Sequence, residues 1–247
     1  GYAVVYRLIS GTWTRLVGVA QPVGTGGGNG PIVGELYGSA QYESFGHAVD
    51  ISADGNRVVI GAYGHSSDLG RVQVFDWNGS NWVQAGADLI GLYSGDRYGM
   101  SVAISDSGST IAVGAPGGMR DSSPTHNGYI DVLDWDGSQW NKRNIGSGGA
   151  GKGNDGGAGT GFTLTGVSIY GVQYQSLFGT VVKLSADGTI VAASATKRGG
   201  AAITNQLTFP NRTGSARVFT YNASTDRYSV VGVIDGKAAE LAHGGGT

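Results

Sequence analysis

Few residues of this chain stand at the spacings that catalysis or metal binding requires. Histidine occurs only at His47, His65, His126 and His243, and no two of these have the spacing of a zinc ligand pair. There is no cysteine, which excludes disulfides and cysteine-ligated zinc. A Ser-His-Asp triad stays open, since its members need not be close in sequence. The sequence predicts no enzyme and no catalytic, cofactor-binding or metal-binding residue; a hydrolase is the most distant alternative.

One glycine-rich stretch matches nucleotide-binding motifs by letters alone. Gly146, Gly148 and Gly151 have the spacing of a dinucleotide fingerprint, but more glycine follows where that motif needs a helix. Lys152 comes next, as in a phosphate-binding loop. Gly153 then replaces the Ser or Thr that would bind Mg²⁺. We therefore expect no nucleotide site.

Paired aromatic residues recur along the chain. Two interpretations are open: the pairs lock a hairpin or pack between sheets, or they offer a platform for sugar rings. Trp82 and Trp140 are the candidate contact residues for the second. The pairs are Tyr6/Trp13, Trp77/Trp82, Trp135/Trp140 and Tyr221/Tyr228.

Three asparagines stand in N-x-[ST] sequons and are candidate N-glycosylation sites: Asn78, Asn211 and Asn222. Asn78 and Asn222 fall in the same predicted hairpin turn of different repeats. Asn78-Gly79 is also a good turn sequence in its own right. The placement is compatible with glycans on exposed turns of a secreted protein.

An internal repeat organises the chain. Each copy opens with an aromatic residue and glycine, continues with alternating apolar residues, and reaches a polar turn ending in glycine. A strand that ends in small residues follows at a constant distance. A second module then runs from a glycine to a closing aromatic residue. The aromatic-glycine pairs are Phe45-Gly46, Tyr98-Gly99 and Phe178-Gly179, and the small strand ends are Gly61-Ala62, Gly114-Ala115 and Ser194-Ala195.

Each copy is predicted to hold four short strands, because period-two alternation between Gly, Asn, Asp and Ser turns is typical of strands. Four antiparallel strands repeated radially form a propeller blade. The sequence predicts an all-β, β-propeller-like array with about three and a half blades in this chain. It is taken as a single region, 1–247. The half blade is expected at 1–20, full blades at about 45–90, 98–146 and 178–234, and glycine-rich insertions at 24–30 and 146–161.

The repeat resembles the FG-GAP family, the blade type of integrin α-subunit heads. Phe45-Gly46 and Phe178-Gly179 match the FG element, and Gly114-Ala115-Pro116 matches GAP. The closer similarity is to a variant with S-x-D-G turns and a W-x-G-x-x-W hairpin, found in large secreted and surface proteins of microbes and algae. The resemblance implies an extracellular β-propeller.

Calcium loops of the Asp-x-Asp-x-Asp-Gly type belong to integrin-like repeats. Calcium binds six to eight oxygens. The matching turns of this chain hold a single acid each, Asp54, Asp106 or Asp187. The sequence therefore predicts no cofactor, with calcium as a minor alternative.

The balance of charge limits the partners. The formal net charge is −2 and only 14% of residues are charged, which argues against nucleic acid. No apolar run is long enough for a membrane-spanning helix.

Resemblance and sequons together favour a non-enzymatic, extracellular structural or adhesion module. We expect a fragment of a larger surface or filament-forming glycoprotein that contacts other proteins, copies of itself or glycans. The alternative is a lectin-like propeller. The chain starts in a third strand and stops in a linker, so we expect a longer chain or a second chain that supplies the missing strands.

Overall fold

The computed structural model describes residues 1–16, 35–118, 127–143, 162–165, 168–171, 176–196 and 214–235. Within these residues the fold is all-β, with one helical turn, α1 (His65–Asp68). Ser66, Ser67 and Asp68 of that turn have positive φ, so it is a left-handed turn rather than a regular helix.

The strands form one half sheet and three full sheets, which follow one another along the chain. The half sheet contains β1 (Tyr2–Val4), β2 (Tyr6–Ile9), β3 (Thr12–Arg15) and β4 (Glu35–Tyr37). The first full sheet contains β5 (Ala48–Ile51), β6 (Arg57–Ala62), β7 (Arg71–Trp77), β8 (Trp82–Gln84) and β9 (Leu89–Ile90). The second full sheet contains β10 (Ser101–Ile104), β11 (Thr110–Ala115), β12 (Tyr129–Trp135), β13 (Trp140–Lys142), β14 (Phe162–Thr165) and β15 (Ser168–Gly171). The third full sheet contains β16 (Phe178–Leu184), β17 (Ile190–Ala195), β18 (Ser215–Asn222) and β19 (Arg227–Asp235).

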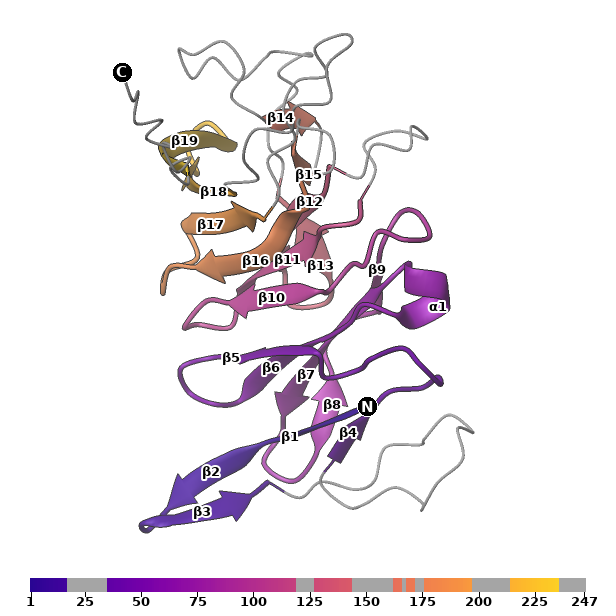
Figure 1. Cartoon of the computed structure of the whole chain (residues 1–247). Coiled ribbons are helices and arrows are strands. Elements are labelled where there is room, and N and C mark those ends of the chain that lie inside the picture. Colours follow the sequence, from indigo (N-terminus) through magenta and orange to yellow (C-terminus); the bar gives the residue numbers. More distant parts are fainter. Residues whose placement is uncertain are drawn as a thin grey trace, which may run out of the picture.

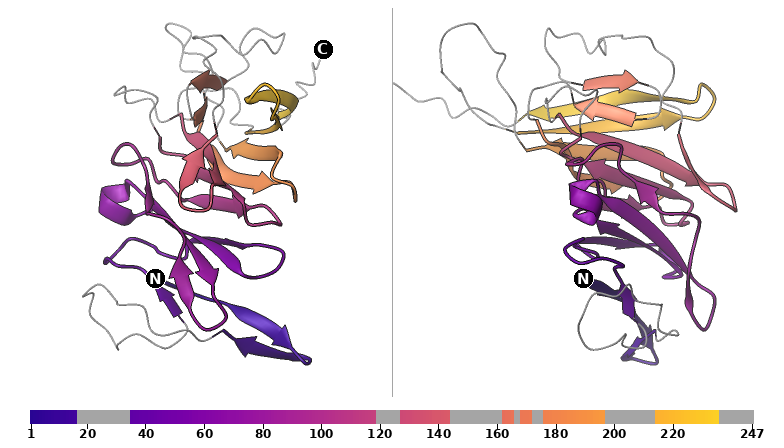
Figure 2. Two further views of the ribbon diagram at one scale, coloured as in Figure 1. Left: turned by 180° about the vertical axis from the view of Figure 1, so that it is seen from behind. Right: turned by 90° about the vertical axis from the view of Figure 1, so that its right-hand side faces the viewer.

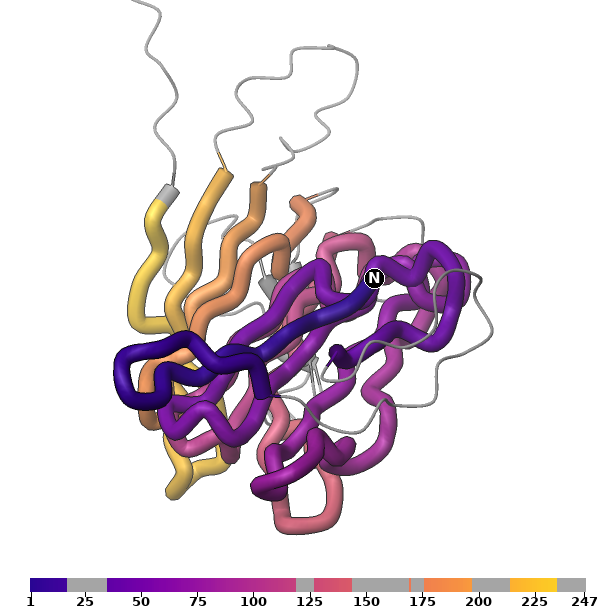
Figure 3. Tube along the Cα trace, turned by 90° about the horizontal axis from the view of Figure 1, so that it is seen from below, coloured from indigo at the N-terminus to yellow at the C-terminus, as the bar shows by residue number. Residues whose placement is uncertain are grey.

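The sheets are stacked face to face (Figure 1), from the N-terminal hairpin β2–β3 at one end to β16–β19 at the other. The side view confirms that the described strands form a stack and do not close into a ring (Figure 2). Seen along the stack, β1–β2 and the strands of the third full sheet run in different directions (Figure 3). This turn from sheet to sheet follows from the twist of each sheet.

Every full sheet has the same antiparallel order. Strand one pairs with strand two, two with three, and three with four, as in β5-β6-β7-β8. The half sheet contains only the third and fourth strands of this pattern. β1 and β2 together take the place of strand three, and β3 and β4 take that of strand four. The predicted all-β class and the four-stranded antiparallel sheets are therefore confirmed.

Strand four has a second part that the sequence did not reveal. In the first full sheet β8 pairs with the end of β7, and β9 then pairs with its beginning. β4 and β15 occupy the same place against β1 and β12. In the third full sheet β19 runs unbroken along β18. Because segments of different length precede β4, β9 and β15, their spacing carries no repeat signal.

Three apolar cores fill the three spaces between sheets. They form because successive side chains of a strand point alternately to the preceding sheet and to the following sheet. The core between the half sheet and the first full sheet contains Val5, Leu16, Leu36, Phe45, Val58, Ile60, Phe75 and Trp82. The next contains Val59, Val72, Val74, Val102, Ile104, Ile111, Val113, Tyr129, Leu133 and Trp140. The last contains Ala103, Ala112, Ile130, Val132, Phe178, Val182, Val191, Phe219 and Tyr228.

Candidate functional site

Neighbouring sheets touch through backbone at the glycines of the repeat. A Cβ atom on Gly61 would lie 2.0 Å from the carbonyl oxygen of Gly99, and one on Gly114 would lie 2.0 Å from that of Gly179. No side chain fits at such a distance. The aromatic-glycine pair and the small strand end therefore meet across each space between full sheets, and this contact explains why the repeat has glycine on both sides.

An arginine spans each of the three spaces between sheets. Arg7 donates to the carbonyl of Gly55 at 3.2 Å, Arg57 to that of Gly108 at 2.9 Å, and Arg143 to that of Gly188 at 2.6 Å. Each acceptor glycine lies in the turn between strands one and two of the following sheet. These arginine clamps come from β2, from β6 and from the residue after β13.

Two of the clamps also stack on the paired aromatic residues. The Arg57 guanidinium lies 5.1 Å from the centre of the Trp135 ring, and that of Arg143 lies 4.4 Å from the centre of the Tyr221 ring. Both distances suit a cation–π contact. The pairs Trp135/Trp140 and Tyr221/Tyr228 therefore pack between sheets, in line with the structural interpretation of the repeat.

Trp82 and Trp140, the candidate sugar-contact residues, are inside the stack. They are 3% and 8% exposed, and the Trp140 indole N–H donates to the carbonyl of Ala85 at 3.0 Å. Neither ring has a free face to stack on a sugar. The structure thus corrects the proposed platform: each tryptophan is covered by the preceding sheet, which the sequence pattern could not reveal.

Two of the three sequon asparagines lie in exposed hairpin turns. The Asn78 side-chain oxygen accepts from the backbone N–H groups of Ser80 and Asn81, and that of Asn222 accepts from Ser224. Asp136 makes the same turn contact in the second full sheet. Turn chemistry alone therefore accounts for asparagine here, and glycosylation stays a prediction. Asn211 lies outside the described residues.

The turn carboxylates of the S-x-D-G motif are engaged within their own turns. The Ser185 hydroxyl donates to Asp187 at 2.5 Å, and the hydroxyl of Ser52 donates to Asp54 at 2.6 Å. The bond from Ser185, followed by bonds from Thr189, lowers the pKa of Asp187 to about 2. The bond from Ser52 likewise lowers the pKa of Asp54. These charges stabilise the turns above pH 4, and the stabilisation is lost as the pH falls through the lowered pKa.

A buried polar network lies at one end of the first full sheet, and sequence analysis missed it. Glu43 is fully buried and accepts from Arg71 at 2.8 Å, with a nitrogen of His65 at 3.1 Å. Arg71 also pairs with Asp88 at 3.1 Å. Glu43 stands two residues before the aromatic-glycine pair Phe45-Gly46. A carboxylate at this position of the repeat is the sequence signal that could have revealed the network.

The second full sheet repeats this arrangement with other residues. Asp96, again two residues before the aromatic-glycine pair, is fully buried and accepts from the Tyr129 hydroxyl at 3.0 Å. It also accepts from the backbone N–H of Leu92 at 2.8 Å. Burial, with nearby Asp131, raises the pKa of Tyr98 well above its ordinary value. Both networks anchor the loops at this end of the stack.

No metal centre emerges from these carboxylates. Across the described part of the chain, no three His, Cys, Asp or Glu side chains are grouped closely enough to hold an ion. Nor does any helix in that part have the length and apolar character needed to cross a membrane.

The half sheet borders an open groove of about 410 Å³. One wall is formed by residues 2–6 of the half sheet. The floor is formed by Gly46, Val49, Asp50, Ile51 and Val58 of the first full sheet. In the full sheets, strands one and two occupy the equivalent position, so the groove is the space that they leave vacant.

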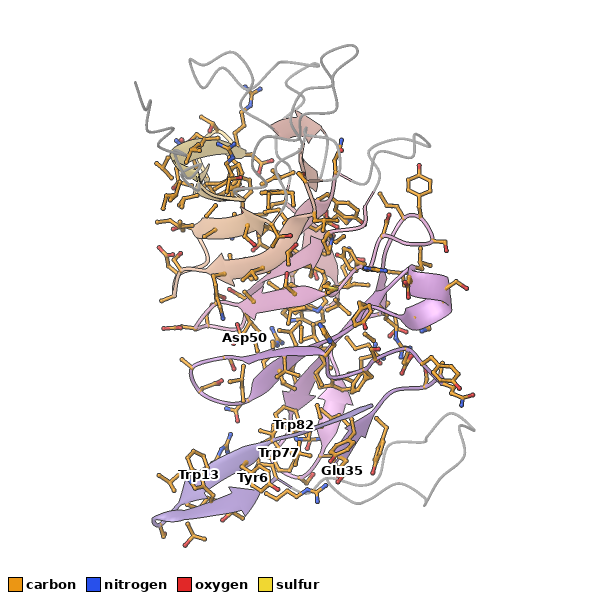
Figure 4. The ribbon with its side chains drawn as sticks, in the orientation of Figure 1. Tyr6, Trp13, Glu35, Asp50, Trp77 and Trp82 are labelled. Carbon is orange, nitrogen blue, oxygen red and sulfur yellow. The ribbon has the colours of Figure 1, made fainter. Side chains whose placement is uncertain are left out.

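Exposed aromatic residues mark the outer face of the half sheet. Trp13 is 68% exposed and lies on the N-terminal hairpin with Tyr6, whereas Trp77 and Trp82 lie where that hairpin meets the first full sheet (Figure 4). Leu8 pairs with Trp13 on the same face. Trp13 is at the repeat position of Trp82 and Trp140 but has no sheet over it. The groove and this outer face are the candidate binding surfaces.

Comparison with known proteins assigns no family to the chain. No protein-family model and no curated protein matches the chain. Among solved structures it is similar to a candidate 6-phosphogluconolactonase from Bacteroides uniformis, at 13% identity and TM-score 0.44 over 76% of this chain and 40% of that one. It is also similar to Sqt1 of Saccharomyces cerevisiae, at 10% identity and TM-score 0.43 over 80% of this chain and 38% of that one. A third is TolB of Acinetobacter baumannii, at 13% identity and TM-score 0.28 over 74% of this chain and 42% of that one.

These proteins have propeller-like folds, and the chain spans less than half the length of each. The prediction that the chain is not an enzyme is contradicted by the Bacteroides uniformis protein, whose name is that of an enzyme. We withdraw that prediction. At this level of similarity no activity transfers to the chain.

Proposed function

We propose that the chain is a structural module of an extracellular surface or filament assembly, built from propeller-type blades of the FG-GAP kind. Its role is to hold a rigid stack of sheets in place and to offer the exposed faces and turns of that stack for contact with further polypeptide. One observation carries this proposal. Trp13 is 68% exposed at the end of the stack, whereas Trp82 and Trp140, at the same repeat position inside it, are 3% and 8% exposed.

The opposite end of the stack has the same character. Val181, Val231 and Ile234 of the third full sheet are exposed. Large exposed apolar side chains gathered on two faces of a stack are typical of surfaces that further polypeptide covers. The extracellular location rests on the repeat resemblance and on the two sequon asparagines in exposed turns.

The test is the mass and the location of the native protein. We expect protein recovered from the cell surface to exceed the 25.2 kDa of the sequence, with a mass that decreases when N-glycans are removed. The decrease should disappear when Asn78 and Asn222 are both replaced by glutamine. A native protein found only inside cells, without glycans at either position, would overturn the proposal.

A lectin-like propeller is the second candidate, and the exposed Trp13 favours it. Its prediction is glycan-array binding that Trp13→Ala abolishes and that a substitution at the exposed Val231 leaves unchanged. A protein interface at this face predicts no glycan binding in either variant.

A further inference from the structure

Three hairpin turns of the stack are built alike, and one of them joins asparagine to glycine. The turn residues are Asn78-Gly79-Ser80 in the first full sheet, Asp136-Gly137-Ser138 in the second and Asn222-Ala223-Ser224 in the third. All of them are exposed. Glycine has no Cβ atom to shield its backbone nitrogen from the side chain before it. In the first turn that nitrogen can therefore react with the asparagine amide.

The turn holds the Asn78 amide over the backbone that follows it. The side-chain oxygen Oδ1 accepts from the backbone N–H of Ser80 at 3.0 Å, from the Ser80 hydroxyl at 3.0 Å and from the N–H of Asn81 at 2.8 Å. Three donors on one carbonyl oxygen stabilise the negative charge that develops there when a nucleophile attacks the carbon. The nitrogen of Gly79 lies inside the ring that these bonds close, so it is the nearest nucleophile.

The nitrogen of Gly79 is also available. Its N–H donates to no group among the described residues. A Cβ atom built on Gly79 meets nothing within 4 Å, so the backbone has room to change its conformation. The nucleophile is therefore neither engaged in a hydrogen bond nor enclosed.

The other Asn-Gly pair of the described chain, Asn127-Gly128, lacks these conditions. Asn127 is 9% exposed. The N–H of Gly128 donates to the carbonyl of Gly118 at 3.0 Å. A Cβ atom on Gly128 would lie 2.1 Å from the carbonyl oxygen of Phe178. The same dipeptide therefore has an engaged nitrogen and crowded surroundings at this second position.

The second full sheet shows that such a turn accepts the acid that the reaction forms. Asp136 stands where Asn78 stands in the first full sheet, and its Oδ1 accepts from the N–H of Gln139 at 2.9 Å and from that of Ser138 at 2.8 Å. These bonds, with the one from Gln139 the strongest, hold the pKa of Asp136 well below its usual range. The turn thus stabilises a carboxylate.

We propose that Asn78 deamidates spontaneously in the folded protein and that its aspartate product keeps the turn. The Gly79 nitrogen loses its proton to hydroxide and bonds to Cγ of Asn78, while the carbonyl electron pair moves onto Oδ1. When that pair returns, the Cγ–Nδ2 bond breaks and Nδ2 leaves as ammonia with a proton from water.

Water then opens the cyclic imide, and nothing is oxidised or reduced. Addition at Cγ gives aspartate and restores the peptide bond to Gly79, whereas addition at the backbone carbonyl carbon gives isoaspartate. This inference goes beyond the proposed function and does not depend on where the protein is located.

The test follows the full chain over time at mildly alkaline pH. The protein is produced without N-glycans, since a glycan would occupy the same Nδ2 atom. Peptide mapping by mass spectrometry measures the change from amide to acid at each asparagine. We expect Asn78 to react at least about tenfold faster than Asn127. It should also react faster than Asn222, whose side chain makes similar turn bonds but is followed by alanine.

Two controls separate the fold from the dipeptide. In denaturant both Asn-Gly pairs are free, so the rates at Asn78 and Asn127 should become similar. Ser80→Ala removes one donor to Oδ1 and should slow the reaction at Asn78, whereas Ser138→Ala, which removes the matching hydroxyl of the second full sheet, should not. Asn78→Asp should melt at the temperature of the unchanged chain.

Equal rates at Asn78 and Asn127 in the folded chain would overturn the inference. A difference that persists in denaturant would overturn it too, because the cause would then be the neighbouring sequence. An unchanged rate in Ser80→Ala would contradict the role given to the turn. A lower melting temperature for Asn78→Asp would contradict the claim that the product keeps the turn.

Discussion

Replacing Arg143 by alanine is expected to lower the free energy of unfolding by about 2–4 kcal/mol. The Arg143 side chain is largely buried and holds both oxygens of Asp134, at 2.6 and 2.9 Å. It also donates to the Gly188 carbonyl and to the Tyr228 hydroxyl across the space between sheets. The variant removes all of these bonds, although Asp134 keeps the bond from the Thr110 hydroxyl at 2.7 Å. Water screens the half-exposed Asp134, which keeps the effect below that of a fully buried pair.

Arg97→Ala is the matched control. Arg97 forms a single exposed ion pair with Asp68, at 3.4 Å, and its loss should cost less than about 1 kcal/mol. Arg143→Met, which keeps the apolar stem over Tyr221, should fall between the two. Chemical denaturation followed by circular dichroism measures all three. Equal effects of Arg143→Ala and Arg97→Ala would show that the clamp does not hold the sheets together.

Gly114→Ala is expected to destabilise the chain by about 3 kcal/mol or more, at the upper end of overpacking effects. The added Cβ atom would lie 2.0 Å from the carbonyl oxygen of Gly179 and 2.3 Å from the hydroxyl of Ser101. The first obstacle is backbone, which cannot rotate away. The second and third full sheets would have to separate, and the core between them would loosen.

Gly232→Ala tests whether any added methyl group in a strand has this effect. A Cβ atom on Gly232 has nothing within 4 Å, so its change in free energy of unfolding should stay within about 0.5 kcal/mol. If Gly114→Ala yields no folded protein while Gly232→Ala folds normally, the predicted destabilisation by Gly114→Ala is also supported. Similar stability of the two variants would contradict the close approach of the sheets.

The sequence predicted the strands because spacing and alternation survive in every copy of the repeat. It could not show why the glycines recur, since the contact joins residues of different copies. Ser194 illustrates this. It occupies the position of Gly61 and Gly114, and among the described residues no further sheet lies on that face. Within the described residues Ser194 therefore does not make the backbone contact between sheets that Gly61 and Gly114 make.

The candidate site was less predictable than the fold. The arginine clamps arise at unrelated repeat positions, so Arg7, Arg57 and Arg143 show no pattern in the sequence. Each nevertheless reaches the equivalent turn of the following sheet. The aromatic pairs did show a pattern. Whether a pair is covered depends on the preceding sheet, however, which is why Trp82 and Trp140 were candidates and Trp13 is the exposed residue.

The account depends most on the order in which the sheets are stacked, and cysteine cross-linking tests that order directly because the chain contains no cysteine. The turns of successive sheets are joined by backbone bonds from Ala53 to Asp106 at 3.0 Å and from Asp106 to Ala186 at 2.8 Å. Such bonds bring α-carbons to roughly 5–6 Å, within disulfide reach. Ala53→Cys with Asp106→Cys, and Asp106→Cys with Ala186→Cys, should each form an internal disulfide on mild oxidation. Ala53→Cys with Ala186→Cys, which skips a sheet, should not. Cross-linking of the skipped pair as fast as the neighbours, or of no pair, would contradict the stack.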